Sequence, residues 1–124
     1  DNGADLTLSF ERYHPLPGGH CKFFIVYDEP SRLFWLASNP VARLENDRRF
    51  LMLWYGCDGL NWFPAGCIAR ARRLDESFMY PSMLVDGDDL VVFSRTSRDA
   101  RHYHDADLLT FHRVKGFRSL AIDL

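Results

Sequence analysis

The sequence predicts an all-β domain of two four-stranded antiparallel meanders, preceded by one extra strand. Apolar residues recur with a period of two or in short unbroken runs, which are typical of strands, and no stretch sustains the 3.6-residue period of a helix. Clusters of Gly, Pro, Asp and Asn separate these runs, as expected of turns. The same order of strands, tight turns and a long polar loop occurs twice along the chain.

The composition is that of a globular domain. The chain has 124 residues, of which 47% are hydrophobic and 15% aromatic, so it carries enough apolar surface for a packed core. A net charge of −2 gives no reason to expect a nucleic-acid partner or an anionic membrane surface. No run approaches the ~18 apolar residues of a membrane span. Because the sequence opens on Asp1 without an initiator Met, we expect a processed or excised piece.

The three cysteines predict no metal site. Cys21, Cys57 and Cys67 form no CxxC pair, so a structural zinc is not expected. Reduced cysteines, buried as small hydrophobic side chains, are the first interpretation. A Cys57–Cys67 disulfide across one hairpin is the alternative.

The first half of the chain contains the extra strand and the first meander. We expect a half-buried strand over residues 5–14, where Leu6, Leu8 and Phe10 alternate with polar residues. The Pro-Leu-Pro-Gly-Gly run then breaks it, which makes residues 1–19 an extra strand and linker. The first meander takes residues 20–70, with strands expected at 23–27, 33–37, 50–55 and 62–69.

The second meander takes residues 77–124, with strands expected at 78–85, 90–96, 108–114 and 117–122. Asp86 to Asp89 form the first turn, in which Gly87 supplies a positive φ. The apolar run from Leu90 to Phe93 is too short for a helix, so it predicts a strand covered on both faces. The polar loop over residues 97–105 is where chemistry would sit on this scaffold.

The repeat suggests an architecture. The two meanders are offset by roughly 55 residues, near the length of a four-stranded propeller blade. We therefore predict two four-stranded, propeller-like blades plus one extra strand. Such an open pair would leave apolar faces uncovered, so we expect either a piece of a longer propeller or a homo-oligomeric ring.

The turn from Cys57 to Trp62 is similar to a shortened Asp-box, the Ser-x-Asp-x-Gly-x-x-Trp hairpin of sialidase-type propellers. In such a turn Asp58 accepts backbone amides, Gly59 takes a positive φ and Trp62 packs into the blade. Cys57 or Gly56 stands where Ser or Thr is usual, and one residue is missing. With the stretches 15–29 and 80–118, the chain resembles the carboxyl-terminal part of bacterial sialidase-like proteins.

The resemblance implies an orientation. In these propellers the Asp-box turns lie opposite the active site, so residues at the other ends of the strands face the site. That end would hold four of the five histidines: His14, His20, His102 and His104. It would also hold the polar stretches 39–49 and 70–80, Arg95 and the loop 96–107. His112 would lie inside a strand.

Sialidases attack with a tyrosine paired with a carboxylate, use an Asp as acid and base, and hold the sugar carboxylate with arginines, whose planar fork binds both oxygens. The resemblance implies catalytic roles for Tyr80, Arg95 and Asp105. It implies substrate binding by His20, His102, His104 and Asp107. Alternatively, Tyr80 is a core residue, Arg95 braces a loop, and the two aspartates fix the loop through backbone hydrogen bonds.

Two functions follow from these residues. The first is a sialidase-like glycoside hydrolase module that acts on terminal, possibly acidic sugars. The second is a non-catalytic carbohydrate-binding or scaffolding propeller. Either has a glycan as its partner and needs no cofactor or metal. The resemblance favours a secreted or periplasmic protein.

Overall fold

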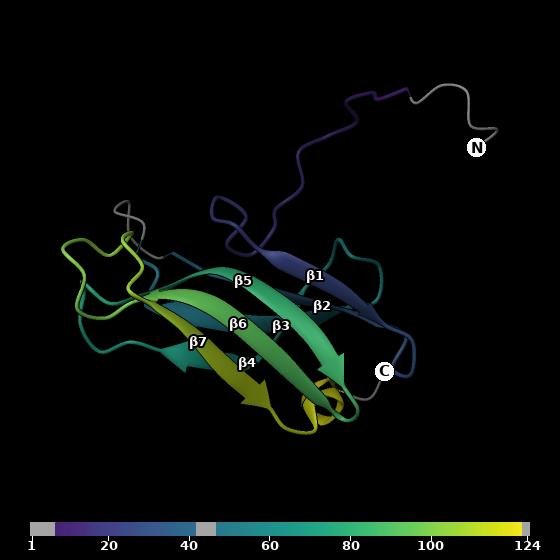
Figure 1. Ribbon diagram of the computed structural model, residues 1–124. Coiled ribbons are helices and arrows are strands. Elements are labelled where there is room, and N and C mark those ends of the chain that lie inside the picture. Colours follow the sequence, from purple (N-terminus) through teal and green to yellow (C-terminus); the bar gives the residue numbers. More distant parts are fainter. Residues whose placement is uncertain (1–6, 42–46, 123–124) are drawn as a thin grey trace.

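The computed structural model describes residues 7–41 and 47–122, which form seven strands and one short 3-10 helix, η1 (Phe117–Leu120) (Figure 1). The first sheet has the order β1 (Phe24–Asp28), β2 (Leu33–Ser38), β3 (Phe50–Gly56), β4 (Phe63–Arg70). The second has the order β5 (Ser77–Asp86), β6 (Asp89–Ser97), β7 (Leu108–Val114). All pairs are antiparallel meander neighbours, so the all-β prediction is confirmed.

The two sheets stack face to face as two layers (Figure 1). Trp35, Leu53 and Tyr55 of the first sheet form one core cluster with residues of the second sheet, including Leu90 and Val92. Alternate residues of each strand face this core, as a pleated sheet requires. The sandwich thus fixes which strand ends lie together.

Phe117 closes the core from outside the sheets. Its ring is fully buried and meets the Trp35 ring edge-on, with centroids 4.8 Å apart. The expectation of a strand over 117–122 is wrong, because Gly116 takes a left-handed conformation (φ 55°) and turns the chain into η1. Ser119 then donates both its backbone N–H and its hydroxyl to the Gly116 carbonyl. The second sheet therefore has three strands, not four.

The expected extra strand over 5–14 is also wrong within the described residues, since 7–14 belong to no strand; residues 5 and 6 lie outside the described part. Leu8, Phe10 and Tyr13 are 87%, 74% and 93% exposed. An alternating pattern gives a strand only where a sheet edge is available to pair with it. No closed ring of blades is formed, and the propeller architecture remains a prediction.

The cysteines are free thiols, and no Cys57–Cys67 bridge is formed. Cys21 is buried as expected, whereas Cys57 and Cys67 are exposed, because they lie in a turn and on the edge strand β4. In the described parts of the chain, no helix is long and apolar enough to cross a bilayer.

A row of hydroxyl groups crosses the core side of the second sheet near β7. Thr110 Oγ1 lies 2.6 Å from Thr96 Oγ1 and 3.0 Å from both Ser94 Oγ and His112 Nε2. Ser94 and Thr96 are buried, so these mutual hydrogen bonds compensate for lost water. The row is the polar part of an otherwise apolar interface.

Candidate functional site

Tyr80 occupies a bulge in β5. Met79 pairs with Arg95 and Ser82 with Phe93, so Tyr80 and Pro81 together stand opposite the single residue between Phe93 and Arg95 on β6. The Tyr80 backbone has a φ of 50°, a conformation that a bulky residue rarely adopts. Bulges redirect side chains and often lie beside functional sites. The bulge thus marks this end of the sandwich as the candidate site.

Three side chains from separate segments meet Tyr80. Its hydroxyl is hydrogen-bonded to His104 Nε2 at 3.1 Å. The guanidinium carbon of Arg95 lies 5.1 Å from the ring centroid and that of Arg48 lies 5.9 Å away, both within cation–π range. The structure therefore brings together Tyr80, Arg95 and His104 of the sequence-predicted set and adds Arg48.

An open cavity of about 460 Å³ lies beside Tyr80 and Arg48. It is also lined by the segment before β1, which runs from Gly19 to Phe23 and includes His20 and Lys22. The described residues around the cavity include two cations and no carboxylate. His20 accordingly shares this end of the molecule with Tyr80, and the cavity suits an anion.

Arg48 has an unmet hydrogen-bonding requirement. Its Nε is buried, and no described residue accepts its proton. The backbone of Arg48 is fixed in place because its carbonyl accepts the Phe78 N–H at 2.9 Å, which ties the segment before β3 to the start of β5. A buried donor without an acceptor is costly, so this part of the site is not at its most stable.

Asp107 braces the loop between β6 and β7. Its two carboxylate oxygens accept the backbone N–H groups of Arg98 and Asp99 at 2.9 and 3.0 Å. These bonds hold the pKa of Asp107 below its usual range. Its carboxylate is thus engaged in the loop-fixing role that the sequence left as the alternative to substrate binding.

His102 and Asp105 act on the same loop in different ways. His102 Nδ1 accepts the His104 N–H at 3.2 Å, and the His102 carbonyl accepts the Asp105 N–H at 2.8 Å. His102 therefore orders the backbone that carries His104. The Asp105 side chain is exposed, and among the described residues it has no hydrogen-bond partner.

The turn from Cys57 to Trp62 lies at the opposite end of β3 from Arg48. Asp58 Oδ1 accepts the N–H groups of Leu60 and Asn61 at 2.8 and 2.7 Å, and Gly59 has a φ of 71°. The Asn61 and Leu60 amides lower the pKa of Asp58 to about 2. Asp58 and Gly59 thus shape a tight turn, while Trp62 is half-buried, with its Nε1 unpaired among described residues.

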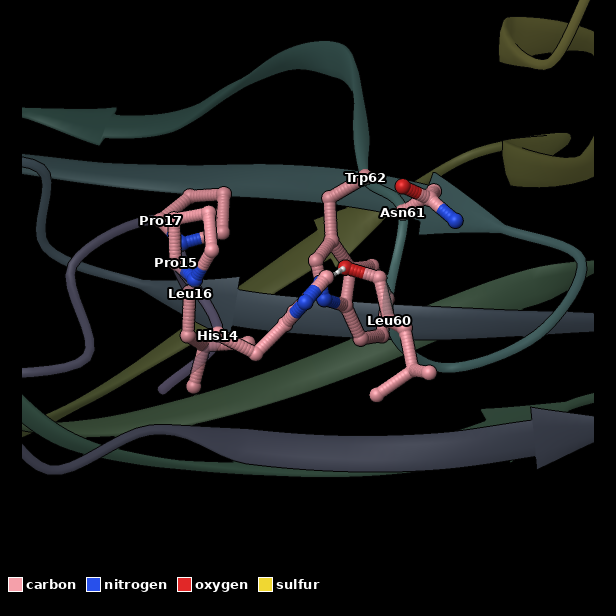
Figure 2. Close-up of a pocket in the computed structure, with 7 residues that line it drawn as sticks. All are labelled: His14, Pro15, Leu16, Pro17, Leu60, Asn61 and Trp62. Atoms are coloured by element: carbon pink, nitrogen blue, oxygen red, sulfur yellow. Dashed lines mark hydrogen bonds between the residues drawn. The ribbon is translucent and has the colours of Figure 1, made fainter. Parts of the chain in front are cut away.

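His14 lies at this turn and not at the Tyr80 end, so that part of the histidine prediction is wrong. Its Nε2 lies 2.7 Å from the Leu60 carbonyl oxygen, and together with residues 15–17 and 60–62 it lines a second cavity of about 390 Å³ (Figure 2). Residues 16–19 then form a turn closed by the hydrogen bond from the Gly19 N–H to the Leu16 carbonyl. His14 and His20 therefore line different cavities.

Arg48 and Lys22 were not singled out from the sequence. Arg48 lies within the stretch 39–49 and Lys22 lies two residues after His20, both placed at the site end by the resemblance, and that position is the signal that could have found them.

Comparison with family models, curated proteins and solved structures found no match for this chain. The structure defines a two-sheet, all-β protein in which arginine and histidine side chains surround Tyr80 at one end. In its described parts, no three His, Cys, Asp or Glu side chains gather as a metal site.

Proposed function

We propose that the Tyr80 site binds a terminal acidic sugar through the sugar carboxylate. The observation that carries this proposal is the placement of two guanidiniums, Arg48 and Arg95, against one tyrosine ring. Arginine forms paired hydrogen bonds with a carboxylate, and such charge-assisted bonds are stronger than neutral ones. The two guanidinium groups would gain a carboxylate acceptor in the complex.

The neighbouring groups suit the rest of a sugar. His20, Lys22 and His104 lie around the same tyrosine and can donate to hydroxyl oxygens. The cavity of about 460 Å³ is of the size that small ligands occupy. This is the binding module of the two functions that the sequence suggests.

Glucuronate and glucose test the proposal, because they differ only in the carboxylate. Isothermal titration should show glucuronate bound at least about tenfold more tightly than glucose, the effect of one charge-assisted contact. Arg48→Ala and Arg95→Ala should each remove this preference, while the control Arg72→Ala, in the exposed connection after β4, should keep it. Equal affinity for both sugars, or no effect of either arginine, would reject the proposal.

Hydrolysis is the second candidate, favoured by the hydrogen bond between the Tyr80 hydroxyl and His104. Tyr80 oxygen would attack the anomeric carbon while its proton passes to His104 Nε2. The bond to the leaving-group oxygen would break as Asp105 transfers a proton to that oxygen. Water, deprotonated by Asp105, would then release the sugar, and Tyr80 would recover its proton from His104.

A fluorogenic 4-methylumbelliferyl glycoside of an acidic sugar separates the two candidates. Turnover that Tyr80→Phe abolishes, with sugar binding preserved, would assign hydrolysis. Binding without turnover would assign the binding module. Both candidates suit a two-blade piece of a sialidase-like β-propeller, secreted or periplasmic, in which other blades would complete the site.

A further inference from the structure

The outer edge of β7 is an open strand edge. β7 is the last strand of the second sheet, and its seven residues pair with β6 in regular register from Leu108 to Val114. Among the described residues, no backbone hydrogen bond joins β7 to any other segment. Such an edge presents a row of free N–H and C=O groups to any extended chain.

β7 lacks the features that protect the edge strands β4 and β5. The edge strand β4 contains Pro64 and two register shifts, and the edge strand β5 contains the Tyr80–Pro81 bulge. β7 has no proline, glycine or bulge, and Leu109 and Phe111 on its outer face are 72% and 53% exposed. Protected edges resist strand pairing, whereas β7 is built to accept it.

A segment with strand character stands unpaired in the same chain. The amino-terminal arm, residues 7–13, alternates Leu8 and Phe10 with polar residues but belongs to no strand. Its apolar side chains are almost fully exposed, which is unfavourable for an isolated segment. The arm has the same number of residues as β7.

We propose that the arm of one copy pairs antiparallel with β7 of a second copy and supplies the missing fourth strand of its second sheet. Among the registers that place Leu8 and Phe10 on the outer face, the one that pairs all seven arm residues with β7 sets Phe10 opposite Phe111. It also sets Thr7 opposite Val114 and Tyr13 opposite Leu108. This pairing is a strand exchange between identical chains.

The central residues of the added strand match their neighbours on both faces in this register. On the outer face, Phe10 extends the existing Phe93–Phe111 pair, whose ring centroids are 5.4 Å apart. On the core side, Ser9 stands opposite His112 and Glu11 opposite Thr110, so both join the hydroxyl row that crosses this edge. The match is at the centre of the strand, at Phe10 on the outer face and at Ser9 and Glu11 on the core side, whereas Leu8 stands opposite Arg113 and Arg12 opposite Leu109.

The occupant is a second copy because the arm cannot reach this register within its own chain. The hydrogen bond to Leu60 holds His14 at the turn between β3 and β4, which lies at the Val114 end of the sandwich. Tyr13 opposite Leu108 would lie six residues along β7, roughly 20 Å from that end. Adjacent Cα atoms are only about 3.8 Å apart. Figure 1 shows the arm leaving the body beyond β1, away from β7.

Light scattering on the intact chain tests the proposal. We expect a mass above the 14.4 kDa of one chain that rises with concentration. Phe10→Asp and Leu109→Lys should each weaken association at least about tenfold, since the first places a charge beside Phe111 and the second places a cation opposite Arg12. The control Leu74→Asp, in an exposed connection outside both elements, should associate as the unaltered chain does.

Mixing the two variants distinguishes strand exchange from nonspecific association. The arm of the Leu109→Lys chain and the edge of the Phe10→Asp chain are both intact, so the mixture should associate where each variant alone does not. Hydrogen exchange should show the arm amides protected only in the associated form. A monomer at concentrations up to about 1 mM, a mixture that stays monomeric, or arm protection in the monomer would each overturn the proposal.

Discussion

Arg118 of η1 forms a bidentate ion pair with Asp28, the last residue of β1. Arg118 Nε donates to Asp28 Oδ2 and Nη2 donates to Oδ1, both at 2.8 Å. Asp28 is 2% exposed, and its Oδ2 also accepts the Ser31 N–H and hydroxyl. The pair joins the first sheet to the helix whose Phe117 closes the core. It therefore fixes the chain's last described element in place.

Arg118→Ala should destabilise the fold by about 3 kcal/mol, because it leaves a buried carboxylate without its counter-charge. Arg113→Ala is the matched control. Arg113 bonds Asp86 and Asp89, but these groups are more exposed, so its loss should cost less than about 1 kcal/mol. Urea unfolding of the two variants checks the difference, and equal losses would contradict it.

The same pair predicts a pH dependence. The pKa of Asp28 is lowered to about 2 from the model-compound value of 3.8, and the hydrogen bond that Asp28 accepts from Arg118 is the main cause. A lowered carboxyl pKa stabilises the fold fully above pH 3.8, and this contribution is lost as pH falls toward 2. The stability gap between the unaltered chain and Arg118→Ala should shrink by about 2 kcal/mol over that window. A gap that stays constant would show that the ion pair is not its origin.

Sequence patterns located the seven strands because each has an apolar run with turn residues at its ends. They failed at residues 7–14 and 117–122. There the apolar pattern is as regular as in the observed strands, but the neighbouring structure determines whether a strand forms. Residues 7–14 have no sheet edge in their own chain, and Gly116 turns the chain before Phe117 can extend β7's hairpin. A segment becomes a strand only when it pairs with another segment. The local pattern of one segment does not show whether such a partner is available.

The site was foreseen in part for the same reason. The position of Tyr80, Arg95 and His104 at neighbouring strand ends could be worked out from the order of strands and the family resemblance. The bulge at Tyr80 could not, because a register shift depends on both strands of a pair. Arg48 was missed because its approach to Tyr80 depends on how the sheets stack.

His112 predicts a second pH dependence, near neutrality. Its ring lies in the hydroxyl row and packs edge-on against Phe78, and burial lowers its pKa. The unfolded chain therefore binds a proton more readily, and stability falls as pH drops below the ordinary value of 6.5. His112→Gln keeps a hydrogen-bonding side chain but cannot titrate, so its stability should change less between pH 7.5 and 5.5. Identical profiles for the two proteins would contradict this role of His112.

The backbone conformation of Tyr80 predicts that a glycine variant there is more stable than an alanine variant, the reverse of the usual order in a strand. With a φ of 50°, its backbone is in a region that glycine occupies freely and alanine does not. Tyr80→Gly should therefore be more stable than Tyr80→Ala by about 1 kcal/mol, although both lose the ring. Leu84, an exposed residue later in β5 with ordinary strand geometry, is the control, and there Leu84→Ala should be the more stable by about 0.5–1 kcal/mol. Thermal unfolding of the four variants measures both differences. The same order at both positions would mean that the bulge carries no backbone strain, and the structural reason for placing the site at Tyr80 would then be lost.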